Sequence, residues 1–140
     1  MLETTAHIMR VKKRDGTLEP VDVTKIVERV TRNCQGLTQV DPLRVATKAI
    51  SGLYDGASTN ELDNLCIQTA SLLIGEEPEY SRLAARLLST YIDEEVRSQQ
   101  IQSFADSVSF GFKAGILAED TYKFVEQNKA ALCAAIEPYR

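Results

Sequence analysis

Apolar residues recur every three or four positions in four successive segments between residues 23 and 95, and this spacing predicts four amphipathic helices. Their predicted apolar faces comprise Ile26, Val27, Val30 and Cys34 in the first helix, Val45, Ala46, Ala49, Ile50 and Leu53 in the second, Leu62, Leu65, Cys66, Thr69 and Leu73 in the third, and Tyr80, Leu83, Ala84, Leu87, Leu88, Tyr91 and Ile92 in the fourth. Because short loops join these segments, the helices are expected to form a four-helix bundle.

Residues with strong capping preferences mark where these helices begin and end. An acidic or hydroxyl side chain accepts hydrogen bonds from the free N–H groups at a helix start, and glycine adopts the left-handed conformation that follows many helices. The predicted starts are Asp22, Asp41 followed by Pro42, Ser58 with Glu61 at capping-box spacing, and Pro78, and the predicted stops are Gly36, Gly56 and Gly75.

The segment before the first helix predicts a β-hairpin. Residues 6–23 contain two short alternating stretches around an Asp-Gly turn at residues 14–17, and Gly16 accepts the positive φ that such turns require. Pro20 ends the second strand early, which is typical of an edge strand. An isolated hairpin is not stable, so it is expected to lie on the bundle. The predicted fold is therefore mainly α, a four-helix bundle capped by a small N-terminal β-hairpin.

The pattern changes after residue 97. Gly111 and Gly115 interrupt the apolar spacing there, and one last helix is predicted over residues 118–136. We therefore expect a domain at residues 1–97 and an additional C-terminal helical segment at 98–140.

Composition and charge exclude several classes of function. The 140 residues can bury one sizeable core, and a net charge of −4 disfavours a generic nucleic-acid-binding protein, so any bound anion requires a local cluster of cations. The apolar runs are too short for a membrane span, and the first residues do not resemble a signal peptide, so a cytoplasmic protein is expected. His7 is the single histidine and the three cysteines form no C-x-x-C pair, so no metal site is predicted from the sequence.

Cations and hydroxyl groups near two predicted turns form a candidate anion site. Lys13 and Arg14 lie at the hairpin turn, and Lys25 lies in the first turn of a helix, where a cation opposes the helix dipole at a cost of about 0.3–1 kcal/mol. A nearby anion would compensate for that cost. Ser58 and Thr59 supply hydroxyl and N–H groups at the start of the third helix.

A carboxylate and apolar side chains beside these cations indicate an adenine nucleotide. Glu19 can accept a hydrogen bond from an exocyclic amine, and Val11, Val21 and Ile26 supply apolar surface. Taken alone, cations at a turn are usually solvated and hydroxyl residues at a helix start are usually plain caps. These patterns by themselves therefore indicate a helical domain with a candidate anion site.

Three blocks of sequence, in order, resemble the ATP-cone, the regulatory nucleotide-binding module of ribonucleotide reductases. The blocks are VKKRDGTLEPVDVTKI at residues 11–26, ISGLYDGASTNELDNL at 50–65 and PEYSRLAARLLSTYI at 78–92. The later segment ILAEDTYKFVEQNKAALCAAI resembles the region that follows the cone in the large (α) subunit of aerobic, class I reductases, where a helix leads into the catalytic barrel.

The resemblance implies allosteric control of overall reductase activity. In the family ATP favours the active enzyme and dATP favours inhibited higher oligomers. The implied partners are ATP or dATP with Mg²⁺, the rest of the large subunit, the radical-generating small (β) subunit and further copies of the large subunit. The reductase is an oxidoreductase, but Cys34, Cys66 and Cys133 match none of its catalytic cysteines, so these 140 residues are expected to be non-catalytic.

The resemblance also implies individual site residues. Lys13 and Arg14 would contact phosphates, Glu19 the adenine amine, Thr59 the phosphate or ribose, and Asp63 would help to distinguish ATP from dATP. The full implied nucleotide-binding set is Lys13, Arg14, Glu19, Pro20, Val21, Asp22, Val23, Thr24, Lys25, Thr59 and Asp63.

One departure from the family pattern leaves an alternative open. Glu94 stands where family members commonly have a phosphate-binding lysine, and a carboxylate would repel a triphosphate unless Mg²⁺ bridges the two or the side chain points to solvent. The alternative is a degenerate cone that acts only as a structural or oligomer-interface module. A repressor that joins a cone to a zinc ribbon is disfavoured, because it would need paired C-x-x-C motifs before the cone and this sequence has none. A cone from an anaerobic reductase is disfavoured by the segment after residue 97.

Overall fold

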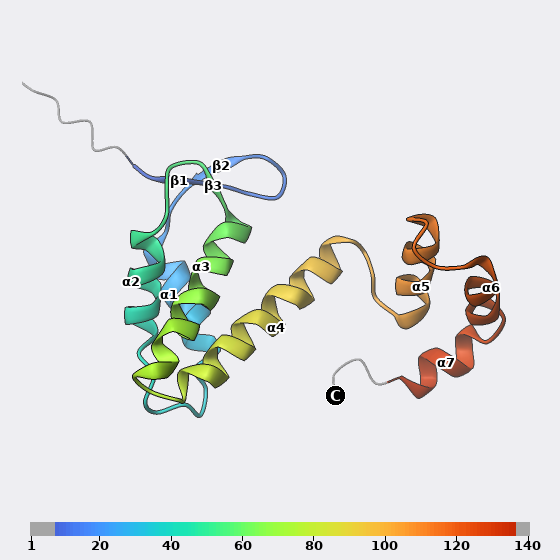
Figure 1. Cartoon of the computed structure of the whole chain (residues 1–140). Helices are drawn as coiled ribbons and strands as arrows, with labels where there is room; N and C mark the ends of the chain where they lie inside the picture. Colours follow the sequence, from blue (N-terminus) through green and yellow to red (C-terminus); the bar gives the residue numbers. More distant parts are fainter. Residues whose placement is uncertain (1–7, 137–140) are drawn as a thin grey trace, which may run out of the picture. The chain divides into compact units, whose positions relative to one another are not determined.

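The computed structural model describes residues 8–136, which form two compact units that meet in the chain between Tyr91 and Ile92 (Figure 1). His7 lies outside the described residues. Within the described part of the chain, no helix combines the length and apolar character that crossing a membrane requires.

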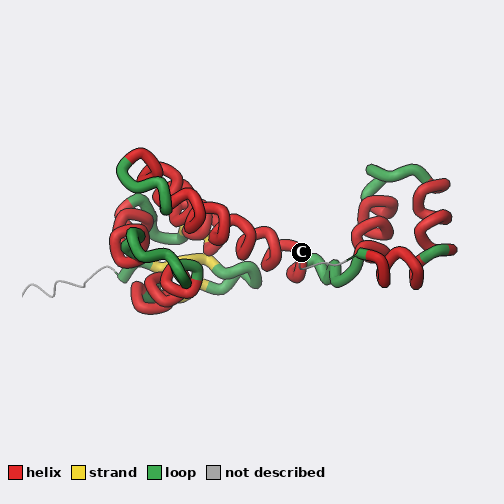
Figure 2. The backbone as a smooth tube through the Cα atoms, turned by 90° about the horizontal axis from the view of Figure 1, so that it is seen from below, coloured by secondary structure: helices red, strands yellow, loops and turns green. Residues whose placement is uncertain are grey.

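A three-stranded sheet lies at one end of the first unit. Strand β1 (Arg10–Lys12) pairs antiparallel with β2 (Leu18–Pro20) and parallel with β3 (Ala57–Ser58), giving the order β2-β1-β3 (Figure 2, yellow). The predicted hairpin is therefore confirmed. Strand β3 was not predicted, because two residues are too short to show any alternation of apolar and polar side chains.

The hairpin loop is held by its own hydrogen bonds. The Lys13 N–H donates to the Thr17 carbonyl at 2.8 Å and the Gly16 N–H to the Lys13 carbonyl at 3.0 Å, while Gly16 has a φ of +86°. This is the turn-plus-bulge arrangement of a three-residue hairpin loop. Asp15 Oδ1 accepts from the Thr17 N–H at 2.9 Å and from its hydroxyl at 2.6 Å, and these bonds lower the pKa of Asp15. The loop therefore presents Lys13 from an ordered base.

The four predicted helices are all present. They are α1 (Val23–Arg32), α2 (Pro42–Ser51), α3 (Thr59–Leu72) and α4 (Tyr80–Ser98). Asp22, Asp41 and Ser58 cap the first three, as predicted: Asp22 Oδ1, for example, accepts from the Thr24 N–H at 2.9 Å. The mainly α fold with a small N-terminal hairpin is confirmed.

Several predicted helix boundaries differ from the structure: α2 ends at Ser51 rather than near Gly56, and α4 begins at Tyr80 rather than at Pro78. The first helix was expected over residues 23–35, but its regular part ends at Arg32 and turns carry the chain to Gly36, which has a φ of +74°. The third helix does not run to Gly75, because its last turn tightens into the 3-10 helix η1 (Leu73–Gly75). Tightened turns of this kind satisfy the last carbonyl groups of a helix, and capping preferences alone do not reveal them.

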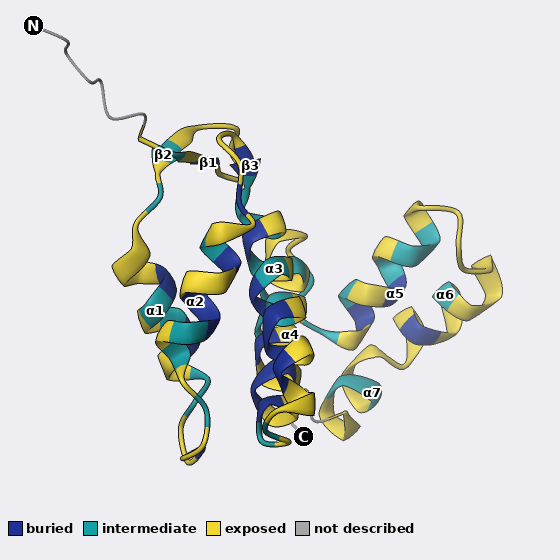
Figure 3. Cartoon of the chain, turned by 60° about the vertical axis from the view of Figure 1, so that its left-hand side comes forward, coloured by how far each residue is buried: buried dark blue, intermediate teal, exposed yellow. Residues whose placement is uncertain are grey.

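The helices of the first unit and the sheet share one core. Buried residues face inward along α1, α2, α3 and the first turns of α4 (Figure 3, dark blue). The largest fully buried side chains are Val30, Val45, Leu73 and Leu83. Val11 of β1 and Ala57 of β3 belong to the same core, so the sheet is anchored to the helices by buried contacts.

The second unit contains three short helices. These are α5 (Phe104–Lys113), α6 (Glu119–Gln127) and α7 (Lys129–Ala135), and Val108 and Val125 contribute to a small separate core. The single helix predicted over residues 118–136 is wrong, because the chain breaks at Asn128, whose backbone leaves the helical region and whose side chain donates to the Phe124 carbonyl at 2.9 Å. Helix α5 was not predicted, since Gly111 lies inside it; a Cβ there would approach Leu117 to 2.9 Å.

The capping box at the start of α3 leads to a first stability prediction. Ser58 Oγ accepts from the Glu61 N–H at 3.1 Å, and Glu61 Oε2 accepts from the Ser58 N–H at 2.7 Å. Ser58→Ala is expected to lower the free energy of unfolding by about 1 kcal/mol, the usual effect of losing an N-cap. Urea denaturation measures the change. Ser71→Ala, in the last turn of the same helix, is the matched control and should have little effect; equal losses would contradict the assignment.

Candidate functional site

A pocket of about 260 Å³ lies in the first unit, between the hairpin, α1 and α3. The side chains that line this pocket include both apolar and charged groups. The lining residues are Val11, Lys13, Glu19, Pro20, Val21, Asp22, Lys25, Ile26, Arg29, Val30, Thr59, Leu62, Asp63, Cys66 and Leu87. The pocket is therefore built from segments that are far apart in the sequence but meet where the sheet covers the helices.

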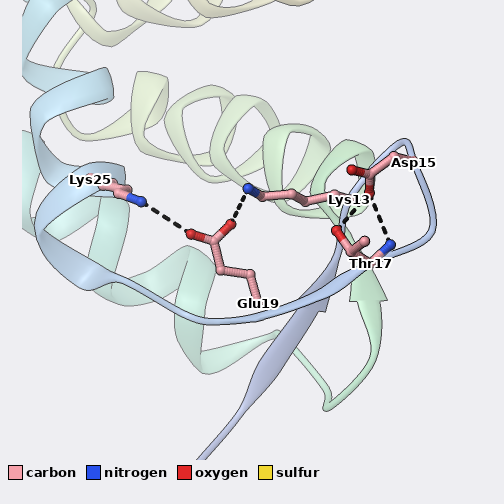
Figure 4. A network of polar contacts seen from close by, with 5 residues as sticks. All are labelled: Lys13, Asp15, Thr17, Glu19 and Lys25. Carbon is pink, nitrogen blue, oxygen red and sulfur yellow. Dashed lines mark hydrogen bonds and ion pairs between the residues drawn. The ribbon is translucent and has the colours of Figure 1, made fainter.

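Three charged side chains meet at the hairpin side of the pocket (Figure 4). Glu19 Oε2 lies 2.5 Å from Lys13 Nζ, and Glu19 Oε1 lies 3.2 Å from Lys25 Nζ. The two lysines come from the loop and from α1, so one carboxylate of β2 bridges two elements. The hydrogen bond and charge of Lys13, followed by those of Lys25, lower the pKa of Glu19, and the bond to Glu19 raises the pKa of Lys13.

A second ion pair lines the pocket between α1 and α3. Arg29 Nη1 of α1 is 3.2 Å from Asp63 Oδ1 of α3, and the Asp63 side chain is only 12% exposed. Cys66 lies one turn after Asp63 on α3 and is buried; burial, with a smaller contribution from the charge of Asp63, raises the pKa of its thiol to about 11. The thiol is therefore protonated at neutral pH and acts as an apolar wall group.

The arrangement of cations beside an apolar pocket suits an anionic ligand with an apolar body. A family model described as the ATP cone domain matches residues 9–95, which include every residue that lines the pocket. The chain belongs to the ATP-cone family.

The relatives of this ATP-cone chain are large chains of one enzyme. It is 35% identical to the ribonucleoside-diphosphate reductase large chain of Neurospora crassa over 91% of this chain and 14% of that protein. The corresponding large chain of Schizosaccharomyces pombe is 38% identical over 91% and 17%, and the large subunit of Caenorhabditis elegans is 36% identical over 90% and 17%. The chain thus spans less than a fifth of the length of these relatives.

The ATP-cone pocket brings most of the predicted site residues together. Those that line it are Lys13, Glu19, Pro20, Val21, Asp22, Lys25, Thr59 and Asp63. Arg14, Val23 and Thr24 are not among the lining residues. The run of predicted residues from 19 to 25 is interrupted because helix α1 begins within it, and successive side chains of a helix point about 100° apart.

Several lining residues of the ATP-cone pocket were not predicted. Arg29 is the most informative, because it lies one turn after Lys25 and between the buried residues Ile26 and Val30. A cation at a half-buried position of an amphipathic helix was the available signal. Its carboxylate partner comes from α3, so only the packing of α1 against α3 reveals the pair.

Two of the sequence-based predictions concern metal ions. Among residues 8–136, no group of three or more His, Cys, Asp or Glu side chains is placed to hold a metal ion. Glu94 lies on α4 beyond the division between the two units, so an Mg²⁺ near it stays a prediction.

Proposed function

We propose that the ATP-cone pocket binds an adenine nucleotide effector, ATP or dATP, and that the chain thereby controls the overall activity of a ribonucleoside-diphosphate reductase. The observation that carries the proposal is the convergence of Lys13 and Lys25 on one carboxylate at the edge of an apolar pocket. Cations in such a position can hold phosphates while the pocket holds the base.

The size and chemistry of the pocket suit part of a nucleotide. At about 260 Å³ it lies near the lower limit of ligand pockets, which measure about 300–1,000 Å³, so the base and sugar would fill it and the phosphates would extend to its rim. Val11, Val21 and Ile26 would contact the base. Lys13, with Arg14 beside it, and Lys25 would hold the phosphates, and Mg²⁺ would accompany the triphosphate as a further positive charge.

Other pocket residues would recognise the remaining groups. Thr59 lies at the N-terminus of α3, where a hydroxyl and backbone N–H groups suit a phosphate or ribose oxygen. Asp63 would accept a hydrogen bond from the ribose and so separate ATP from dATP. Pro20, Val21, Asp22, Val23 and Thr24 would form the wall beneath the nucleotide.

We further propose that this chain is part of a larger reductase subunit. The large subunits that resemble it are named ribonucleoside-diphosphate reductases. Residues 1–97 would be the regulatory domain and residues 98–140 would lead toward a catalytic barrel. ATP would favour an active enzyme and dATP an inhibited oligomer of large subunits, acting in the cytoplasm with a radical-generating small subunit.

Isothermal titration calorimetry of the 140-residue chain with ATP and with dATP, each with and without Mg²⁺, tests this function. Saturable binding of either nucleotide supports it. The second candidate, a degenerate cone with only a structural or interface role, is favoured by Glu94 in place of the family's lysine. A folded chain that shows neither heat nor a thermal shift with both nucleotides would favour that second candidate, and Glu94→Lys would then be the first variant to test for recovery.

A further inference from the structure

The charges that line the pocket are balanced. Three lining residues are cations and three are carboxylates among the described residues, and each carboxylate has an assigned contact. Glu19 contacts Lys13 and Lys25, and Asp63 contacts Arg29. Asp22 accepts hydrogen bonds from the N–H groups of Thr24 and Lys25 in the first turn of α1. A polyphosphate chain therefore meets two lysines that share one carboxylate, which already offsets half of their combined charge.

Glu19 holds the position that a phosphate group would take. Its two oxygens contact the two ammonium groups at 2.5 and 3.2 Å, which is how two phosphate oxygens would contact them. A phosphate that binds both lysines must displace this carboxylate or lie beside it, where like charges repel. Displacement without a new partner would leave Glu19 with the cost of two lost ion pairs.

We propose that Glu19 makes this pocket selective for a complete nucleotide over bare polyphosphate, because its carboxylate engages both lysines and offsets half of their combined charge until a ligand supplies a hydrogen-bond donor in their place. The inference rests on the proposed nucleotide site. Such a donor is an exocyclic amine, which adenine carries and which inorganic tripolyphosphate lacks. Recognition of the base and of the phosphates is thereby coupled through one side chain, and neither part of the ligand binds well alone.

The lowered pKa of Glu19 agrees with this role. The hydrogen bonds and charges of the two lysines hold the carboxylate ionised well below neutral pH, so it stays an anion throughout the physiological range. An anion both repels a phosphate and accepts a hydrogen bond from an amine, whereas a protonated carboxyl would do neither as strongly.

Titration of Glu19→Gln with three ligands tests the inference. Glutamine keeps the shape of glutamate but loses its charge, and its amide can turn to donate or to accept. Inorganic tripolyphosphate should bind about tenfold more tightly than to the wild-type chain, the effect of releasing two partly exposed ion pairs. The preference for ATP over inosine triphosphate, whose base carries a carbonyl in place of the amine, should fall. Glu28→Gln, on the exposed face of α1, is the control with the same charge change and should alter neither value.

The outcomes separate this inference from the proposed function. Thermal unfolding confirms that each variant folds, and Glu19→Ala repeats the test if the glutamine variant is unstable. Wild-type binding of ATP, with tripolyphosphate bound no better by either Glu19 variant than by wild type, would overturn the inference and leave the function standing. Tight tripolyphosphate binding by Glu19→Gln, with no ATP binding by wild type, would support the role of Glu19 in offsetting the lysine charge and contradict the function. No binding by any of these proteins would contradict both.

Discussion

A chain that carries both Lys13→Met and Lys25→Met is expected to bind ATP about a hundredfold more weakly than the wild-type chain. A hydrogen bond between charged groups contributes about 1.5–3 kcal/mol, and two at the lower end of that range correspond to about two powers of ten in affinity. The lower end applies because the two lysine side chains are 49% and 68% exposed, so water and salt screen them. Methionine keeps the length of the apolar stem.

Calorimetry with ATP and Mg²⁺ measures the loss, and the control keeps the overall charge equal. Lys12→Met with Lys48→Met also removes two cations, but neither residue lines the pocket. That control should retain affinity to within a factor of about three, the effect expected of exposed charges that do not line the pocket. An equal loss in both double variants would show that net charge attracts the nucleotide, and the assignment of a two-lysine phosphate clamp would be wrong.

The helices of this chain could be predicted because their signals are local. Asp22, Asp41 and Ser58 each offer a side-chain oxygen to N–H groups two or three residues later, and the structure shows these bonds. Each capping interaction involves residues within one turn of the helix, so it can be predicted without knowledge of the fold. The hairpin was predicted for the same reason, because Asp15 and Gly16 determine the turn by themselves.

The parts that were not predicted depend on distant contacts. Strand β3 exists because Ala57 lies beside Val11, forty-six positions earlier in the chain, and two residues carry no pattern of their own. Gly111 has a low helix propensity, yet it lies within α5, where the side chain of Leu117 packs so closely that a Cβ at position 111 would lie 2.9 Å from it. In both cases the local preference is weak and a tertiary contact decides the outcome.

The residues of the candidate site could likewise be predicted only where they lie close together in the sequence. Lys13, Glu19 and Lys25 could be named from the sequence because they lie within thirteen residues of one another and surround one turn and one helix start. Arg29 could not be assigned to the site, because its importance lies in a contact with Asp63, thirty-four positions later. The pairing of charges inside the pocket is a property of the fold, and the inference about Glu19 arises from it.

Replacing Leu83 with alanine is expected to lower the free energy of unfolding of the first unit by about 3 kcal/mol, the middle of the range for a fully buried leucine. Leu83 has no exposed surface, and its removal leaves a cavity between α4 and the other helices of the core. A unit of this size is stable by only about 5–10 kcal/mol, so the loss is a large share of the total.

Urea unfolding followed through the amide signals of α1 and α2 reports the first unit separately from the second. Leu72→Ala removes the same atoms from a side chain that is 82% exposed, so it should cost far less. Leu87, one turn after Leu83 on α4, lines the pocket. A nucleotide that binds only the folded unit should restore about 2.7 kcal/mol when present at a hundred times its dissociation constant. Equal losses for Leu83→Ala and Leu72→Ala would show that Leu83 does not contribute to the core. A nucleotide that binds the wild-type chain but does not stabilise the Leu83→Ala variant would show that nucleotide binding is not linked to the stability of that core.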